Sequence, residues 1–387
     1  MPGSGFDPKQ DWTQAEDSDL HRIGARYREI RPGIGQFLFG SDIMKILHVL
    51  NSRIYSGAEK VVCQIIHMFA TDPGMEMVYC SPYSDNVRDM LKQENVSYLP
   101  VSKLVPGQLR RVIREQKPDV IHAHDMRASF ICALCCGSIP LISHIHNNAY
   151  NSRGLSPKSV AYLLAGWKAR HIFWVSRSSF EGYFFHRLFQ EKSSVLFNII
   201  DLNQVYQKRD QDARNYSYDM VFVGRLTYQK NPQRLIELCA LARERKPDFH
   251  LAVVGTGELE PEVKALTAQL GLEANVSFLG FQSNPMKMLS DSKCMILPSR
   301  WEGTPMCALE AMALGVPVVS TPTDGLLDLL DEGENGFLSD DDAVLAEKMV
   351  LLASDPVLRE KLSANAAEKA SGINDIQTYK NALSSWY

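Results

Sequence analysis

The sequence has no hydrophobic run long enough to cross a membrane. A spanning helix needs about 20 consecutive apolar residues, and the most apolar stretch, residues 128–145, is broken by Gly137, Ser138 and Pro140. The N-terminal segment is acidic and polar, so we expect no secretory signal peptide. These absences argue against a helical membrane protein and favour a cytoplasmic one.

The spacing of a disulfide framework or a zinc site is missing too. The eight cysteines are scattered through apolar segments. Cys132, Cys135 and Cys136 superficially resemble a redox or ligand pair, but no second pair lies near them in the sequence. We therefore expect buried free thiols in a reducing compartment.

No repeat of solenoid period and no low-complexity tract occurs. The 387 residues are 45% hydrophobic and 22% charged, a composition typical of globular proteins. A chain of this length is too long for one ordinary domain and suits two.

A strong excess of one charge is absent, but the charge is unevenly spread. Residues 44–192 carry eighteen basic and eleven acidic side chains, a net +7, whereas residues 193–387 carry a net −9. The basic half should attract an anionic partner. We expect that partner to be a membrane surface, not a nucleic acid.

Short apolar strands alternate with amphipathic helical segments from Met44 onward. This alternation predicts an α/β fold with parallel sheets covered on both faces. The first series of strands contains MKILHVL, MEMVYC, VSYLP, DVIHAH, LISHIH, HIFWVS and SVLFN. The second contains MVFVG, FHLAVVG, VSFLG, KCMILPS and VPVVS.

A polar stretch without a hydrophobic face separates the two series and is interpreted as a linker. We expect a cleft between two doubly wound domains to hold the ligand, at the carboxyl ends of their strands. The predicted divisions are an appended or disordered extension at 1–43, a first Rossmann-like domain at 44–206, a linker at 207–218, a second Rossmann-like domain at 219–370, and a C-terminal helix at 371–387 that packs back on the first domain.

The segment MVFVGRLTYQKNP carries two cations beside a predicted helix start. Gly224 and Arg225 end a strand and Lys230 precedes the helix, with Asn231 as its cap and Pro232 at its first position. Two cations at a helix N-terminus form a suitable receptacle for a diphosphate. Surface cations at an ordinary turn are the alternative.

The next strand ends in a Gly-x-Gly turn. Gly255 and Gly257 are followed by Glu260 where a dinucleotide fingerprint has its third glycine, so the fingerprint is weak. Close approach of the backbone to a ligand and a plain turn are both open.

The stretch SRWEGTPMCALEAMALGVPVVS places two glutamates around a Gly-Thr-Pro turn. Pro305 is expected at the first position of a helix capped by Thr304, with Glu302 on the loop before it and Glu310 inside it. A carboxylate accepts hydrogen bonds from sugar and ribose hydroxyls. One glutamate can therefore bind a sugar and the other a ribose, while the helix start faces the diphosphate between them. A solvated helix face is the alternative.

The stretch EGTPMCALEAMALGVPVVST, preceded by VGRLTYQKNP, resembles the retaining glycosyltransferases of family four, which have the GT-B fold of two Rossmann-like domains. The resemblance runs from Met44 to roughly the C-terminus. It implies transfer of a sugar, a hexose or N-acetylhexosamine, from a nucleotide diphosphate donor, preferably a UDP-sugar, to a glycan or lipid-linked glycan acceptor. No metal or other cofactor is expected, because no cluster of aspartates or histidines at ligand spacing is visible near the predicted cleft.

The resemblance also carries site residues. The implied catalytic residues are His146, Glu302, Arg225 and Lys230, with His144 as an alternative to His146. The implied donor-binding residues are Gly57, Asn198, Gly224, Arg225, Lys230, Gly255, Gly280, Phe281, Glu302, Gly303, Thr304, Pro305, Met306 and Glu310.

Several positions depart from the family pattern. Ser56 stands where the first loop usually has a glycine, and Ile199 replaces the glycine of the usual Asn-Gly-Ile-Asp, although Asp201 is kept. One glycine, Gly325, remains of a usual pair, and Asp328 stands where glutamate is usual. Contact with the donor phosphate is therefore expected at Gly57 and not at residue 56.

The resemblance implies that the first domain is the acceptor domain and that the second is the nucleotide-sugar domain. A basic and aromatic segment, residues 167–187, distinguishes this predicted acceptor domain. Its cations and rings are Lys168, Arg170, Arg177, Arg187, Trp167, Phe173, Trp174, Phe184 and Phe185. Such a face can rest on an anionic bilayer. The alternative is that the aromatic side chains belong to the core.

Other functions remain open at this point. A nicotinamide-dependent oxidoreductase would share the doubly wound domains, but the weak fingerprint argues against it. A catalytically silent glycan- or lipid-binding protein is expected to lose Glu310, Arg225 or Lys230, and all three are present. A nucleotide-sugar epimerase of the same fold or a glycogen-type synthase is a further alternative.

Overall fold

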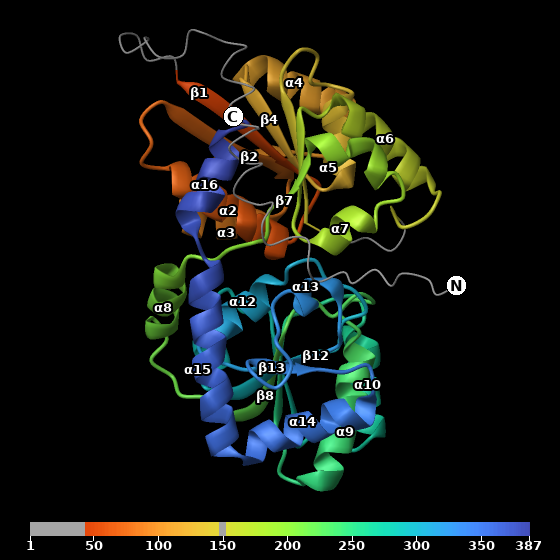
Figure 1. Cartoon of the computed structure of the whole chain (residues 1–387), viewed down its shortest axis with the longest axis vertical. Coiled ribbons are helices and arrows are strands. Elements are labelled where there is room, and N and C mark those ends of the chain that lie inside the picture. Colours follow the sequence, from red (N-terminus) through yellow and green to blue (C-terminus); the bar gives the residue numbers. More distant parts are fainter. Residues whose placement is uncertain (1–42, 147–151) are drawn as a thin grey trace, which may run out of the picture. The chain divides into compact units, whose positions relative to one another are not determined.

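The computed structural model describes residues 43–146 and 152–387. The predicted extension at 1–43 lies outside the described residues, apart from Ile43. Met44–Tyr387 forms one compact unit. Within it, two parallel sheets, each covered by helices, build the α/β architecture that the alternating pattern predicted (Figure 1).

The first sheet has seven strands in the order β3-β2-β1-β4-β5-β6-β7. Its strands are β1 (Met44–Leu50), β2 (Met75–Pro82), β3 (Tyr98–Val101), β4 (Val120–His124), β5 (Leu141–Ile145), β6 (His171–Trp174) and β7 (Ser193–Val195). Its helices are α2 (Gly57–Phe69), α3 (Asp85–Gln93), α4 (Pro106–Gln116), α5 (Met126–Ala133), α6 (Pro157–Lys168), α7 (Arg177–Glu181) and the 3₁₀ helix η2 (His186–Lys192). Helices α2 and α3 cover one face of this sheet and α4, α5 and α6 the other (Figure 1).

The second sheet has six strands in the order β10-β9-β8-β11-β12-β13. Its strands are β8 (Tyr218–Val223), β9 (Leu251–Val254), β10 (Val276–Gly280), β11 (Ser292–Leu297), β12 (Val318–Ser320) and β13 (Gly336–Leu338). The accompanying helices are α8 (Leu202–Asp210), α9 (Pro232–Arg245), α10 (Glu260–Gln269), α11 (Met286–Ser290), α12 (Met306–Ala313), α13 (Asp324–Leu327), α14 (Asp342–Ser354), α15 (Pro356–Ile373) and α16 (Ile376–Ser384).

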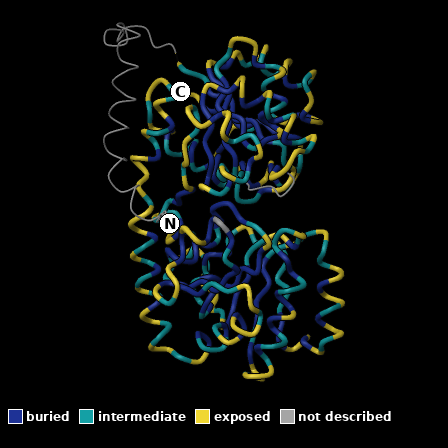
Figure 2. Tube along the Cα trace, turned by 45° about the vertical axis from the view of Figure 1, so that its right-hand side comes forward, coloured by how far each residue is buried: buried dark blue, intermediate teal, exposed yellow. Residues whose placement is uncertain are grey.

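Continuous apolar strands are buried on both faces, because helices pack on either side. All five residues of β4 are buried, for example, and so are all four of β9. Figure 2 shows this buried interior running through both sheets. None of the described helices has the length and apolar character that a membrane span requires.

Some local expectations differ from the structure. The predicted linker begins inside α8, so residues 207–210 are helical. The edge strand β13 was not predicted, because three residues give no period to detect. Cys132 and Cys136 are free and buried, as expected, and Cys135 is half-buried.

Helix α16 packs on the first sheet's side of the molecule, against α2. The ammonium group of Lys380 lies 2.5 Å from the Asp72 carboxylate. Beyond the helix, the Trp386 ring stacks on His171 with centroids 3.9 Å apart, and the Tyr387 hydroxyl lies 2.8 Å from Nδ1 of His122. The last residues of the chain therefore cover part of a sheet built from its beginning.

Candidate active site

A cleft of about 620 Å³ lies between the carboxyl ends of the two sets of strands. This volume is within the usual range for small-molecule sites. Most of the predicted site residues line it: Gly57, His146, Asn198, Gly224, Arg225, Lys230, Gly255, Phe281, Glu302, Gly303, Thr304, Pro305 and Met306. Gly280 does not line the cleft. Glu310 lines a smaller cavity that shares Tyr55, Lys60 and Pro285 with the cleft.

The Gly-x-Gly turn after β9 is required by backbone packing. Gly255 has φ +137°, and a Cβ there would lie 1.9 Å from the carbonyl oxygen of Gly224. A Cβ at Gly257 would lie 2.2 Å from the carbonyl oxygen of Leu226. The carbonyl of Gly280 accepts a hydrogen bond from the Gly255 amide at 2.8 Å, and the φ of +65° at Gly280 favours glycine there without a ligand.

A second tight contact joins the predicted catalytic loops. A Cβ at Gly303 would lie 2.7 Å from the carbonyl oxygen of His146, so only glycine lets this loop meet the end of β5. At Gly57 the nearest atom to an added Cβ is Met306 Cγ at 3.7 Å, an ordinary contact. The structure therefore explains a glycine at 303 by packing, while a phosphate contact at Gly57 stays a prediction.

The start of α12 corrects one prediction. Pro305 is the N-cap residue and the helix begins at Met306, one position later than expected. The Thr304 hydroxyl does not cap the helix, because it donates to the carbonyl of Val175. The Asn198 amide donates to the Thr304 carbonyl at 2.8 Å. Asn198 thus holds the Thr304 backbone from the other domain, and its side-chain Oδ1 is buried with no hydrogen-bond partner among the described residues.

The start of α9 is close to the prediction but differs in its cap. Pro232 is at the first helical position and Asn231 is the N-cap residue, yet Asn231 has φ 53° and its side chain makes no cap hydrogen bond. Its Oδ1 instead accepts from Nη2 of Arg300 at 2.7 Å. Among the described residues no ion pair involves Arg225, whose side chain is exposed at the cleft.

Two of the predicted donor-binding residues are bound to each other. The ammonium group of Lys230 lies 2.6 Å from Oε1 of Glu302, and both side chains are largely buried. Burial alone would lower the pKa of Lys230, but the neighbouring Glu302 outweighs it, so this pKa is raised and the cation persists. The cleft therefore holds a charged pair that an arriving anion or hydroxyl can rearrange.

Glu310 forms a similar pair across the cleft. Its Oε1 lies 2.7 Å from Nζ of Lys60 on α2, a residue that the sequence analysis did not single out. Its Oε2 is buried and has no hydrogen-bond partner in the part of the chain that the structure describes. A buried acceptor without a partner is unfavourable, so Glu310 offers one oxygen to a hydroxyl donor.

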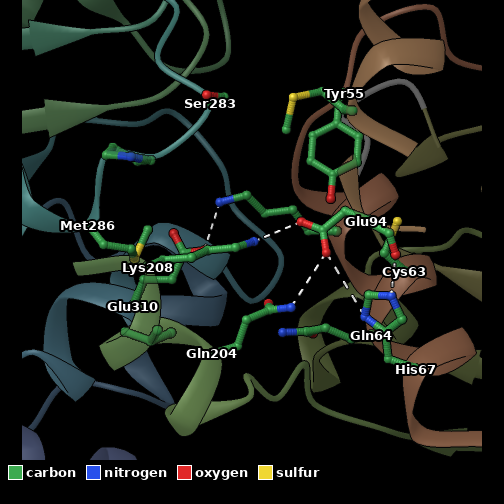
Figure 3. A pocket seen from close by; sticks show the side chains of 14 residues that line it. Tyr55, Cys63, Gln64, His67, Glu94, Gln204, Lys208, Ser283, Met286 and Glu310 are labelled. Carbon is green, nitrogen blue, oxygen red and sulfur yellow. Dashed lines mark hydrogen bonds and ion pairs between the residues drawn. The ribbon is translucent and has the colours of Figure 1, made fainter. Parts of the chain in front are cut away.

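The small cavity beside Glu310 is lined by paired polar side chains from elements of both domains (Figure 3). It holds about 30 Å³, which is room for one water molecule and no sugar. Glu94 lies at its centre, 2.7 Å from Nζ of Lys208 and 3.4 Å from Nε2 of Gln204. The polar side chains that line this cavity are paired with one another, so they do not form a separate ligand site.

His146 lies at the cleft but is tied to other histidines. Its Nε2 lies 2.8 Å from Nδ1 of His124, while its Nδ1 is buried and has no partner among residues 43–146 and 152–387. Burial lowers the pKa of His146 from 6.5 to about 3, so the ring is neutral at physiological pH. His144, the alternative, is fully buried and absent from the cleft lining.

The expectation that no histidine cluster lies near the cleft was wrong. Histidines on β1, β4 and the end of β5 gather on one face of the first sheet. Two groups of three have ring nitrogens within 4.8 Å of one another, and either could hold a metal ion: His48, His122 and His124, and His124, His144 and His146. A search by linear spacing misses them, because the sheet order places β1 beside β4.

Asp125 is a further cleft residue that the sequence analysis missed. It follows β4 directly, in the segment VIHAHD, and its φ of 77° is unusual for a residue other than glycine. Burial, with help from Glu59, raises the pKa of its carboxyl from 3.8 to about 6, against the effect of Lys158 and Arg225. A backbone strained at a cleft and a carboxyl of raised pKa are both common at functional sites. The carboxylate directly after a buried strand was the signal available.

Two Rossmann-like domains with a cleft at the ends of their strands define the GT-B class of glycosyltransferases. Two family models match the chain, Glycosyltransferase Family 4 over residues 55–204 and Glycosyl transferases group 1 over residues 206–369. The chain belongs to the group 1 glycosyltransferases of this family.

Individual relatives agree with that assignment. A glycosyltransferase of Methanocaldococcus jannaschii is 28% identical over 323 residues, which are 69% of this chain and 79% of that protein. The UDP-Gal:alpha-D-GlcNAc-diphosphoundecaprenol alpha-1,3-galactosyltransferase of Escherichia coli is 24% identical over 368 residues, 86% of this chain and 94% of that one. The structure of Anabaena HepE in complex with UDP-glucose has a TM-score of 0.75 at 23% identity and covers 88% of this chain and 98% of its own. The similarity to HepE shows that the two proteins share a fold.

Proposed function

We propose that this glycosyltransferase moves a hexose or N-acetylhexosamine from a UDP-sugar to a glycan or lipid-linked glycan, with retention of configuration and without a metal ion. The donor preference is supported by the E. coli relative, which is named for UDP-Gal, and by HepE, which was solved with UDP-glucose. The lipid-linked acceptor is supported by the diphosphoundecaprenol in the name of the E. coli relative.

The observation that carries the donor assignment is the unpartnered oxygen of Glu310. Glu310 lines the small cavity beside the cleft and not the cleft itself, so a ribose hydroxyl reaches Oε2 only if side chains between the two cavities move; a nucleoside bound in this way would satisfy a buried acceptor that has no partner among the described residues. Glu302, paired with Lys230, is then assigned to the hydroxyls of the donor sugar. This division places the sugar and the ribose on either side of the start of α12.

The leaving diphosphate would develop negative charge as the glycosidic bond breaks. Arg225, Lys230 and the free amides at the start of α12 are the groups proposed to stabilise it. Each well-placed donor of this kind is typically worth about 3–4 kcal/mol in the transition state. We assign the attack to the same face of the sugar, within an ion pair, with His146 holding the donor sugar near its phosphate.

The acceptor side is proposed to rest on an anionic membrane, at its cytoplasmic face. In the segment at 167–187 the cations Lys168, Arg170 and Arg187 are exposed, as is Arg177. Of its aromatic side chains, Trp167 is 62% and Phe184 50% exposed, whereas Phe173 and Trp174 are buried in the core and Phe185 is half-buried. The exposed members combine charge with apolar surface, which suits an anionic bilayer.

A donor panel tests the proposal. Thermal unfolding is followed with UDP, GDP, ADP and CMP and with their sugar conjugates, because a ligand at a hundred times its dissociation constant adds about 2.7 kcal/mol to the free energy of unfolding. A shift with UDP and UDP-sugars only is expected. A shift with the other nucleotides alone contradicts the donor assignment.

Product analysis separates the remaining alternatives. NMR of the anomeric proton during transfer reports retention or inversion directly. Turnover of a UDP-sugar to its epimer without any acceptor would identify an epimerase. Binding without turnover across a panel of lipid-linked acceptors would favour a silent binding protein.

A further inference from the structure

Three of the clustered histidines form a line of hydrogen bonds that ends at the cleft. Nδ1 of His48 lies 3.0 Å from Nε2 of His124, and Nδ1 of His124 lies 2.8 Å from Nε2 of His146. His48 is on β1 and does not line the cleft, whereas His146 does. The line therefore connects the interior of the first sheet with the proposed donor site.

The ring orientations are those of genuine N–H···N hydrogen bonds. His48 and His124 have centroids 5.3 Å apart and planes 28° apart, and His124 and His146 have 5.1 Å and 16°. Nearly coplanar rings at this separation meet edge to edge, so an N–H on one points at the lone pair of the next. By contrast, His122 stacks face to face on His124 at 4.3 Å and bonds to Tyr387 instead.

The protons of the three rings cannot be placed independently. Burial holds the pKa of His48 and of His146 at about 3, and burial, followed by the neighbouring histidines, holds that of His124 well below 6.5, so each neutral ring carries one N–H. A neutral imidazole donates from one nitrogen and accepts at the other. Two arrangements satisfy both hydrogen bonds, and they differ at every ring.

In the first arrangement His48 donates to His124, which donates to His146, so His146 carries its proton on Nδ1. In the second both hydrogen bonds are reversed, His146 donates from Nε2, and its Nδ1 is a bare lone pair. Nδ1 is the only ring nitrogen of His146 left for a ligand, since Nε2 is engaged by His124. The state of His48 thus decides whether His146 can donate or accept.

We propose that His48 and His124 are positioning residues that set the tautomer of His146 and so the kind of atom it offers to the donor. This inference rests on the proposed role of His146 at the donor sugar. A phosphate or hydroxyl oxygen on Nδ1 selects the first arrangement, in which the unpaired lone pair is displaced to Nε2 of His48. Nε2 of His48 is buried and has no hydrogen-bond partner among the described residues, so it can either carry the proton or hold the lone pair.

A metal ion in this cluster would exclude the relay. An ion held by His124, His144 and His146 needs the lone pairs of all three rings, but the second hydrogen bond occupies the line between His124 and His146. A bound metal ion and the line of hydrogen bonds therefore predict different states for the same ring nitrogens: coordination to the ion in one case, an N–H···N hydrogen bond in the other.

Nitrogen NMR on the full chain with ¹⁵N-labelled histidine tests the relay. In the ligand-free protein we expect ¹⁵N–¹⁵N coupling across the hydrogen bonds from His48 to His124 and from His124 to His146. This measurement needs no variant and no knowledge of the donor. Absence of both couplings overturns the relay, and so does a stoichiometric divalent metal in the purified protein whose removal by a chelator changes these signals.

Variants show whether the effect is transmitted. His48→Leu should change the ¹⁵N shifts of His146, and His48→Asn, which keeps a hydrogen-bonding group near the position of Nδ1, should restore part of the pattern. His122→Leu is the matched control, because His122 is equally buried and contacts the same His124 but lies outside the line. An equal response of His146 to His48→Leu and His122→Leu would mean general disturbance and overturn the proposal.

Adding UDP-glucose to the wild-type protein separates the relay from the donor assignment. The relay predicts that the proton pattern at His48 changes when the cleft is filled, although His48 does not touch it. Coupled signals in the free protein with no response to bound UDP-glucose would remove His146 from the donor site and with it the proposed positioning role. Such a result leaves the UDP-sugar assignment intact, because binding is scored separately by the thermal shift.

Discussion

Nζ of Lys230 and Oε1 of Glu302 lie 2.6 Å apart, so two residues that separately point to donor binding hold each other in the cleft. The pair keeps both charges in place where burial would otherwise disfavour them. Under the proposed donor site, a diphosphate that approaches Lys230 would find a cation already oriented, and Glu302 would be released toward sugar hydroxyls. We therefore expect donor binding to exchange the partners of this pair.

Replacement of the donor cations should abolish most transfer. We expect Arg225→Ala or Lys230→Ala to reduce turnover by about 10²-fold or more, since each removes a positive charge from the leaving diphosphate. Steady-state kinetics and a circular dichroism spectrum check activity and fold together. Lys264→Ala, an exposed lysine on α10, is the control. Near-normal turnover in both variants would contradict the assignment.

The Lys60–Glu310 pair should contribute to both stability and nucleotide binding. We expect Lys60→Met to lower the free energy of unfolding by about 1–3 kcal/mol, because Glu310 is left as a buried charge while Lys60 is partly solvated. Glu310→Gln should weaken UDP binding by about 10-fold or more through loss of a charged acceptor. Urea unfolding and calorimetric titration with UDP measure the two effects. Unchanged UDP affinity in Glu310→Gln would exclude the ribose contact.

Asp125 predicts a pH-dependent stability difference. Its pKa is raised from 3.8 to about 6 in the folded protein, so the folded state binds the proton more tightly and stability from this group is lost as pH rises through 6. Asp125→Asn should therefore be more stable than wild type at pH 7, by at most about 3 kcal/mol. The difference should shrink toward zero near pH 4. Urea unfolding of both proteins across this range measures it, and a constant difference would contradict the shift.

Transfer should be independent of added metal. We expect full activity in excess chelator, since the proposed stabilisation of the diphosphate uses Arg225, Lys230 and backbone amides. Activity is assayed after extended dialysis against the chelator, with and without magnesium or manganese added back. Loss of activity that returns with either ion would contradict the proposal.

The proposed membrane surface predicts salt-sensitive binding to anionic vesicles. Each Lys or Arg near such a surface contributes about 1 kcal/mol and is screened over about 8 Å at physiological salt. Sedimentation with anionic vesicles should be strong at low salt and weak at high salt, and negligible with neutral vesicles. Trp167→Ser should weaken it, whereas Val357→Ser, at an even more exposed apolar residue on α15, should not. Indifference to lipid charge and salt would indicate a soluble acceptor.

The fold was predictable because its signals are local. Runs such as MKILHVL and FHLAVVG are apolar throughout, which is the pattern of strands buried on both faces. The positions of Arg225 and Glu302 followed from the same runs, since parallel strands bring their carboxyl ends to one edge. Thirteen of the predicted site residues line the cleft for this reason.

What escaped prediction depends on contacts between distant segments. Thr304 has the right neighbours for a helix cap, but its hydroxyl reaches Val175, 129 residues earlier. The Lys60–Glu310 pair spans 250 residues. The histidine line needs β1 beside β4, an order that the strand pattern does not reveal. Local propensity was overruled at these points by partners that a linear reading cannot identify.

The position of helix α16 also affects the order in which the chain can fold during its synthesis. Its residues cover part of the first sheet, but they are synthesised only after the whole second domain. At translation rates of about 5–20 residues per second, the nascent first sheet waits on the order of tens of seconds with His122 and His171 uncovered. Lys380 then reaches Asp72, and Trp386 and Tyr387 close over the two histidines. We therefore expect the first domain to complete its packing only after the second has been synthesised.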